Sequence, residues 1–123
     1  MNNDFKSEFY RRTYKYSLDV LNFIKSLPSD SATRIIVNQL IRSATSVTAN
    51  IFEAKSASSK KDYINFYTYS LKSANESQLW LNLVRDYLNL KSQDCSCLIK
   101  ETQELGKILA ASILTMKGKR NKI

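Results

Sequence analysis

Apolar residues recur at spacings of three and four in four stretches of the chain, which is the pattern of amphipathic helices. Polar breaks rich in serine and charged residues separate these stretches. Long helices joined by short connections favour an all-α, up-down-up-down antiparallel four-helix bundle. We expect one bundle domain over 1–117, followed by a basic flexible tail over 118–123. The predicted helices cover about residues 5–27, 31–55, 60–90 and 94–117.

Candidate helix boundaries lie in the polar breaks. Pro28 should stop the first helix, because the residue before a proline avoids helical geometry. Ser29, Asp30 and Ser31 are three candidate caps of the second helix. A serine at 58 or 59 can cap the third helix, and Asp94 the fourth.

The apolar faces predict which side chains line the core. The second helix has a clean seam whose middle, 43–49, is made of small residues, which let a neighbouring helix come close or mark a contact between subunits. Gly106 costs about 1 kcal/mol relative to alanine inside a helix. Either a neighbouring backbone packs closely against it, or the helix simply tolerates the glycine. The first helix has a main apolar face and a flanking set: Tyr10, Tyr14, Leu18, Leu21 and Ile24 on the face, with Phe9, Tyr16, Val20, Phe23 and Leu27 beside it.

The third helix has apolar residues around more of its circumference than a single bundle can cover. Tyr69, Trp80 and Tyr87 lie on a second face, beside the core face that carries Tyr67 and Leu81. We expect part of this second face to meet another subunit. The alternative is that the three aromatic side chains are half exposed on one bundle.

Composition supports long helices and removes several classes of enzyme. The 123 residues include two glycines and one proline, which are too few for the many tight turns of a sheet protein. There is no histidine, so neither a Ser-His-Asp triad nor a His-ligated metal site can form. With so little glycine there is no phosphate-binding loop. We therefore expect no enzymatic activity, no cofactor and no metal.

Cys95 and Cys97 are expected to be free thiols. Two ligands cannot close a four-coordinate zinc site, and positions i and i+2 of a helix point to different sides. The alternative is a site completed across subunits. The chain shows no signal peptide or membrane-spanning stretch, so we expect a cytoplasmic protein without a membrane partner.

Positive charge is the main candidate for a binding function. The formal net charge of +8 attracts polyanions, nucleic acid above all. No base-reading motif is present, so little sequence preference is expected; the alternative is that the charges only keep the domain soluble. In an up-down bundle the second helical connection and both termini share one end. The candidate nucleic-acid-binding residues form three clusters: Arg11, Arg12 and Lys15; Lys55, Lys60 and Lys61; and Lys117, Lys119, Arg120 and Lys122.

Arg42, Glu53 and Glu76 form a candidate structural constellation. Arg42 and Glu53 are eleven residues apart, close to three helical turns, and so share one face of the second helix. Glu76 lies on the aromatic side of the third helix. We expect Arg42 to pair with Glu53 or Glu76, within or between subunits, and so to fix helix register. The alternative is a solvated Arg42.

Two runs of residues resemble a known family. The first is Q-x-x-R-S-A-x-S-V-x-A-N-I-x-E at 39–53, and the second is K-D-Y-I-x-F at 61–66 followed by S-x-x-E at 73–76. Together they are similar to the four-helix-bundle proteins encoded by intervening sequences in bacterial 23S rRNA genes. Ala54 departs from the family pattern, which usually has a helix-ending glycine there, so the second helix should run a little further.

The resemblance implies a cytoplasmic, bacterial bundle that forms ring-shaped homopentamers and has no catalytic residues. It also implies kinship with the accessory variability determinant protein of diversity-generating retroelements, a basic pentameric barrel that binds a reverse transcriptase and nucleic acid. We favour a non-enzymatic homo-oligomer that binds RNA or DNA weakly and without sequence preference. The alternatives are an adaptor that docks an enzyme such as a reverse transcriptase, and a structural bundle without a nucleic-acid role.

Overall fold

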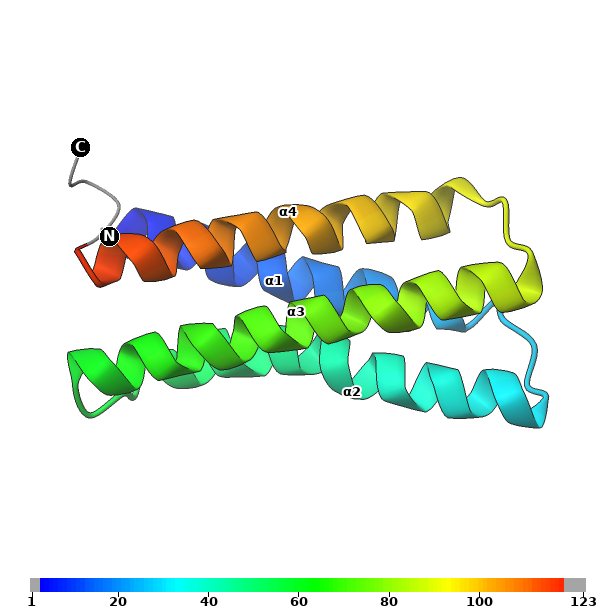
Figure 1. Ribbon diagram of the computed structural model, residues 1–123, viewed down its shortest axis with the longest axis horizontal. Coiled ribbons are helices and arrows are strands. Elements are labelled where there is room, and N and C mark those ends of the chain that lie inside the picture. The colour runs from blue at the N-terminus through cyan, green and yellow to red at the C-terminus, as the bar shows by residue number, and fades with distance from the viewer. Residues whose placement is uncertain (1–2, 119–123) are drawn as a thin grey trace.

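The computed structural model describes residues 3–118, and within them the chain forms four long helices and no strand. The helices run alternately up and down, so that α1 begins and α4 ends at the same end of the bundle as the α2–α3 connection (Figure 1). α3 packs extensively on both α2 and α4, whereas α1 and α4 share the least contact. The predicted all-α four-helix bundle is confirmed. Its helices are α1 (Asn3–Ile24), α2 (Ser31–Ala54), α3 (Lys60–Leu88) and α4 (Gln93–Met116).

Side-chain caps begin three of the helices. The Asp30 carboxylate accepts a hydrogen bond from the Thr33 backbone N–H at 3.2 Å, so Asp30 is the cap among the three predicted candidates. Ser59 caps α3 in the same way, which is also as predicted. The Asp94 prediction was wrong, because the Ser92 hydroxyl caps α4. Asp94 lies inside the first turn instead, where a carboxylate favours the positive end of the helix dipole.

All four helices end one to three residues earlier than the pattern predicted. α1 stops at Ile24 and passes into a turn before Pro28, and α2 ends at Ala54 without the expected extension. α3 ends at Leu88 because Asn89 adopts a left-handed conformation at φ 53°, which closes the last turn.

The predicted core face of α1 was wrong in part, because Tyr10 and Ile24 pack against the core but Tyr14 and Leu18 do not. Tyr14 is 52% exposed and Leu18 is 45% exposed. The predicted faces of α2, α3 and α4 do meet in the core, with Leu40, Leu81 and Leu105 fully buried. The buried side of α1 is the flanking apolar set together with two polar residues: Phe9, Thr13, Tyr16, Ser17, Val20 and Phe23.

Hydroxyl groups explain how polar residues occupy the core side of α1. The Thr13 hydroxyl donates to the Tyr10 carbonyl oxygen of its own helix at 2.8 Å. Between the helices, the Thr48 hydroxyl donates to the Thr13 backbone carbonyl oxygen at 2.6 Å, and the Ser17 hydroxyl donates to the Ala44 carbonyl oxygen at 3.1 Å. A buried hydroxyl costs little when it is hydrogen-bonded. The bonds between the helices therefore join α1 to α2 through positions that apolar periodicity does not mark.

Gly106→Ala is expected to raise the free energy of unfolding by about 0.5–1 kcal/mol, because alanine restricts the unfolded chain and favours helix. A Cβ at this position would lie 3.9 Å from Asn75 Oδ1 and 4.0 Å from Leu71 Cδ1, which are ordinary contacts, so close packing does not require the glycine. Urea denaturation measures the change. Gly118→Ala is the contrasting variant, since its φ of +71° disfavours a side chain. A less stable Gly106→Ala protein would show that the helix pair cannot accept the methyl group.

Candidate anion-binding site

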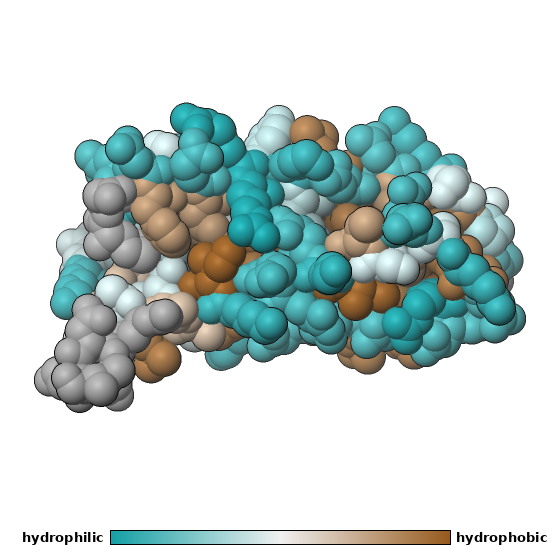
Figure 2. All heavy atoms as spheres, turned by 90° about the horizontal axis from the view of Figure 1, so that it is seen from above, coloured by the Kyte–Doolittle hydropathy of each residue, from teal (hydrophilic) through white to brown (hydrophobic). Residues whose placement is uncertain are grey.

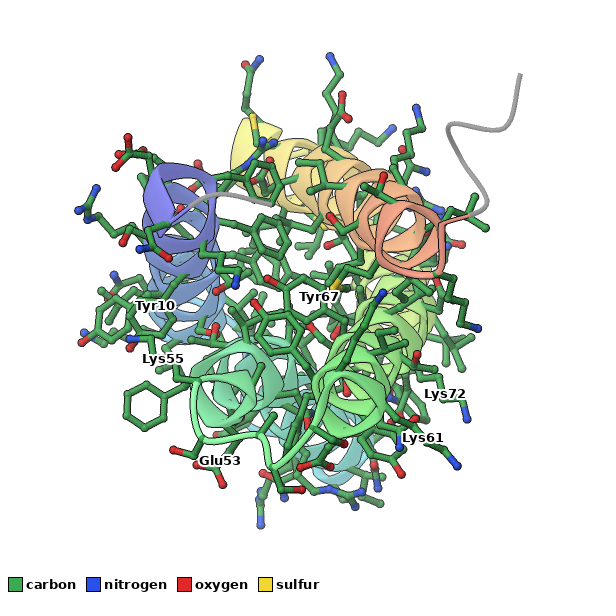
Figure 3. The ribbon with its side chains drawn as sticks, turned by 90° about the vertical axis from the view of Figure 1, so that its left-hand side faces the viewer. Tyr10, Glu53, Lys55, Lys61, Tyr67 and Lys72 are labelled. Atoms are coloured by element: carbon green, nitrogen blue, oxygen red, sulfur yellow. The ribbon has the colours of Figure 1, made fainter. Side chains whose placement is uncertain are left out.

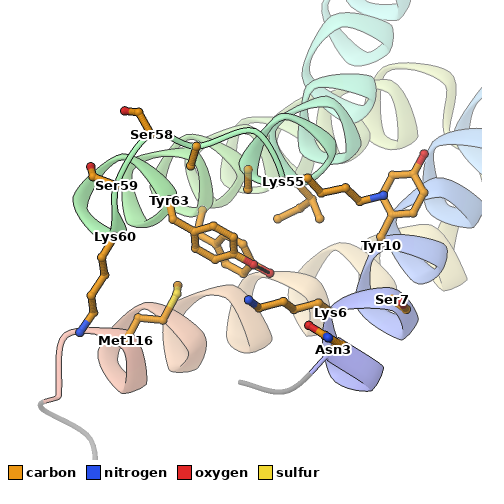
Figure 4. A pocket seen from close by; sticks show the side chains of 14 residues that line it. Asn3, Lys6, Ser7, Tyr10, Lys55, Ser58, Ser59, Lys60, Tyr63 and Met116 are labelled. Atoms are coloured by element: carbon orange, nitrogen blue, oxygen red, sulfur yellow. Dashed lines mark hydrogen bonds between the residues drawn. The ribbon is translucent and has the colours of Figure 1, made fainter.

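A hollow lies at the end of the bundle where α1 begins and α4 ends (Figure 4). Its volume is about 860 Å³, within the range of pockets that hold small organic ligands. Residues from all four helices and the α2–α3 connection line it. Among the described residues of the lining there is no acidic side chain, whereas three lysines and three tyrosines are present: Lys6, Lys55 and Lys60, and Tyr10, Tyr63 and Tyr67.

Aromatic rings, not carboxylates, hold two of the lysines. Lys6 Nζ lies 4.8 Å from the centroid of the Tyr63 ring, and Lys55 Nζ lies 4.5 Å from the centroid of the Tyr10 ring. Lys55 also lies 5.2 Å from the Phe52 ring. A ring face attracts an ammonium group through its quadrupole without neutralising the charge. Within residues 3–118 neither lysine forms an ion pair, so both keep their full charge at the cavity.

Tyr67 forms the inner wall of the cavity. Its side chain is 1% exposed and lies in the middle of the bundle when the structure is viewed end on (Figure 3). The Tyr63 hydroxyl donates to the Tyr67 hydroxyl at 3.3 Å, and the two rings stack with centroids 5.0 Å apart. Burial, reinforced by the Tyr63 hydrogen bond, raises the pKa of Tyr67 far above its usual range. Tyr67 is therefore a neutral hydroxyl that accepts one hydrogen bond and keeps its own proton.

Carboxylates balance the predicted cluster on α1. The Arg12–Glu101 pair is bidentate, with N–O distances of 2.8 and 2.7 Å, and it joins α1 to α4. The hydrogen bond to Glu101 raises the pKa of Arg12 above its ordinary value. This cluster is therefore nearly neutral as a group. Each member has its own partner: Arg11 pairs with Glu8, Arg12 with Glu101, and Lys15 with Asp19.

The remaining candidate nucleic-acid-binding residues differ in how close they lie to the cavity. Lys61 lies outside the cavity lining and points outward from α3 (Figure 3). Lys117 follows the last residue of α4, at the same end of the bundle. The structure thus brings Lys55 and Lys60 together and leaves Lys61 at the margin. The predicted residues Lys119, Arg120 and Lys122 lie outside the described residues.

The sequence interpretation missed Lys6 and the three tyrosines of the cavity. Lys6 stands alone among polar residues, so no run of charge marks it. It precedes Tyr10 by one helical turn near the start of α1, and this position places it beside the α2–α3 connection. That topological signal was available from the sequence.

The expected ion pair of Arg42 within one subunit was wrong. Arg42, Glu53 and Glu76 are all exposed, and none of them forms an ion pair inside residues 3–118. Eleven residues of helix rise about 16 Å, which is too far for Arg42 to reach Glu53. Glu76 instead accepts a hydrogen bond from the Trp80 indole N–H at 2.9 Å. Pairing between subunits stays a prediction.

The second face of α3 is open to solvent. Tyr69 is 52% exposed and Tyr87 is 54% exposed, and both flank the partly buried Trp80. Leu83, on the same face, is 42% exposed. A different face, the one seen from above Figure 1, is mainly polar, and its apolar side chains form separate patches (Figure 2). The contact of the α3 face with another subunit stays a prediction.

Cys95 and Cys97 are free thiols, as expected, and burial raises the pKa of Cys95. The cysteine and acidic side chains of residues 3–118 form no group of three that could hold a metal ion. No helix in this part of the chain has an apolar stretch long enough to cross a membrane.

These features define a small all-helical bundle with a lysine- and tyrosine-lined hollow at one end. The chain belongs to the family of 23S rRNA-intervening sequence proteins, whose model matches residues 6–111. A crystal structure of a protein of unknown function from the S23 ribosomal protein family of Bacteroides thetaiotaomicron is similar. It has 28% sequence identity and a TM-score of 0.78 over 85% of this chain and 97% of that chain.

No curated protein matches the sequence. Neither the family match nor the similar structure shows kinship with the accessory proteins of diversity-generating retroelements, which stays a prediction.

Proposed function

We propose that the protein is a non-enzymatic, cytoplasmic homo-oligomer that binds RNA or DNA weakly and without strong sequence preference. The observation that carries this proposal is the group Lys6, Lys55 and Lys60, three lysines that line one hollow in which no described acidic residue takes part. Phosphate oxygens supply the missing negative charge, and the small cations released from the nucleic acid make the affinity fall as salt rises.

Aromatic side chains beside the lysines favour single strands. Phe52 is 52% exposed, and its ring lies 5.8 Å from that of Tyr10, with Lys55 against both. Unpaired bases stack on such rings while lysines follow the phosphates, and neither interaction distinguishes strongly among the bases. The Tyr10–Phe52 pair therefore extends the basic hollow along the outside of α1 and α2.

Homo-oligomers would form through the second face of α3. An exposed set of large apolar residues on one helix is typical of an interaction surface, and Tyr69, Leu83 and Tyr87 make such a set. A ring of copies, as the family resemblance implies, would gather several lysine-rich ends on one assembly. Arg42 would then meet Glu53 or Glu76 of a neighbouring copy.

The test is fluorescence anisotropy of the full chain with a labelled single-stranded RNA and a labelled DNA, at low and at physiological salt. We expect binding at low salt that weakens as salt rises. If neither nucleic acid binds at low salt, the nucleic-acid role is removed and a structural role remains.

Leu83→Lys is expected to shift the assembly towards monomers, because it places a charge in an apolar contact. Native mass spectrometry at micromolar concentration measures the change. Leu114→Lys is the matched control, since Leu114 is 45% exposed but lies on α4. Circular dichroism checks that both variants keep their helices. A monomeric wild-type chain, or a Leu83→Lys variant that assembles normally, would remove this interface.

A further inference from the structure

We propose that the end cavity is a binding site for one phosphorylated nucleoside, either a free nucleotide or the unpaired terminal nucleotide of a strand. This goes beyond the proposed function, because a free nucleotide can occupy the cavity whether or not longer strands bind. The proposal rests on the size of the cavity, the three lysines that line it and the ring faces beside them.

The size of the cavity suits a ligand larger than an inorganic anion. Its volume of about 860 Å³ lies in the upper part of the range of pockets that enclose organic ligands, roughly 300–1,000 Å³. A lone phosphate ion would leave most of this space to water. A nucleotide supplies a planar base and a sugar to occupy the rest.

The charge arrangement suits a phosphate chain. Lys6 reaches the cavity from α1, Lys55 from the end of α2, and Lys60 from the start of α3, where its side chain extends toward Met116 (Figure 4). Lysine binds phosphate as a mobile point charge, so three of them can follow a di- or triphosphate.

The ring faces suit a planar base. In the free protein Lys6 covers the Tyr63 ring at 4.8 Å and Lys55 covers the Tyr10 ring at 4.5 Å. A phosphate attracts an ammonium group more strongly than a ring face does, so phosphate binding draws these lysines off the rings. The uncovered rings can then stack with the base, as aromatic side chains do in single-strand binding proteins. The Tyr67 hydroxyl remains as a neutral donor on the inner wall.

Isothermal titration calorimetry of the full chain tests this with ADP, adenosine and inorganic phosphate. We expect ADP to bind more tightly than either of its parts, because only ADP uses both the lysines and the rings. Lys6→Gln should weaken ADP binding by about tenfold or more, the size of one lost hydrogen bond to a charged group. Tyr63→Leu should weaken it by a similar factor, because it removes a ring on which the base stacks. Tyr63→Phe, which keeps the ring, should change it much less.

Lys72→Gln is the charge-matched control, because Lys72 is exposed on α3 and points away from the cavity (Figure 3). No ADP binding, or an equal loss in Lys72→Gln and Lys6→Gln, would overturn the proposal. A short 5′-phosphorylated RNA that competes with ADP identifies a strand end as ligand, and ADP binding without competition identifies a free nucleotide. Retained ADP binding without binding of long RNA would defeat the proposed function and leave this site standing.

Discussion

Replacing Lys55 and Lys60 together by glutamine is expected to weaken binding of single-stranded RNA and to make it less sensitive to salt. Each phosphate contact contributes about 0.7 to the slope of log affinity against log salt for a single strand. Losing two contacts should therefore reduce the slope by about 1.4. Fluorescence anisotropy titrations at several salt concentrations measure both the affinity and the slope.

Lys25→Gln combined with Lys91→Gln is the matched control for this prediction. The two variants lose the same charge, but Lys25 follows α1 and Lys91 lies between α3 and α4, at the opposite end of the bundle (Figure 1). Both lysines are exposed and form no ion pair within the described chain. Equal losses in the two double variants would mean that RNA responds to net charge and not to the lysine-rich end.

Cations of α1 would make a poorer test of the same question. Arg12→Gln would leave Glu101 without its partner and add local negative charge, so a loss of RNA affinity would have two causes. The Lys55–Lys60 variant disturbs no ion pair within residues 3–118.

The fold could be predicted because independent local signals agreed. Periodic apolar stretches, capping residues such as Asp30 and Ser59, and the scarcity of glycine and proline all indicated four helices with short connections. A sequence specifies one fold when its apolar pattern, its capping residues and its composition all favour the same structure. Up-down topology then follows from the short connections.

The core face of α1 could not be predicted from apolarity alone. The Thr13 hydroxyl is bonded within its own helix, but Ser17 is accommodated in the core because the Ala44 carbonyl oxygen and the Thr48 hydroxyl of α2 lie opposite it. That information is not local, since it depends on how two helices are aligned. The apolar side chains of Tyr14 and Leu18 consequently formed the more regular stripe while facing solvent.

The candidate site was predicted in part. Topology alone placed Lys55 and Lys60 beside the chain ends, and the structure puts both at the cavity. The α1 cluster was predicted to bind nucleic acid from its run of positive charge alone. The sequence also places Glu8 three residues from Arg11 and Asp19 four residues from Lys15, which is the spacing of ion pairs along a helix. Only the pairing of Arg12 with Glu101, on a distant helix, required the structure.

Ser77→Leu is expected to lower the free energy of unfolding by about 2–4 kcal/mol, which combines overpacking with lost hydrogen bonds. Ser77 is fully buried where α2 and α3 pack, and its hydroxyl lies 2.8 Å from Ser43 Oγ and 2.8 Å from the Ser73 carbonyl oxygen. A leucine has no space between helices held at this separation, so it must push them apart. Urea denaturation followed by circular dichroism measures the loss.

Ser77→Ala separates the two causes, because it removes the hydroxyl without adding volume. We expect it to cost about 0.5–1.5 kcal/mol, the net value of a hydrogen bond. The Ser43 hydroxyl keeps a second partner, the Leu40 carbonyl oxygen at 3.3 Å, so the alanine leaves it bonded. If leucine and alanine cost the same, hydrogen bonds and not small side chains set the spacing of α2 and α3. A leucine variant as stable as the wild type would mean that the seam of small residues is not closely packed at all.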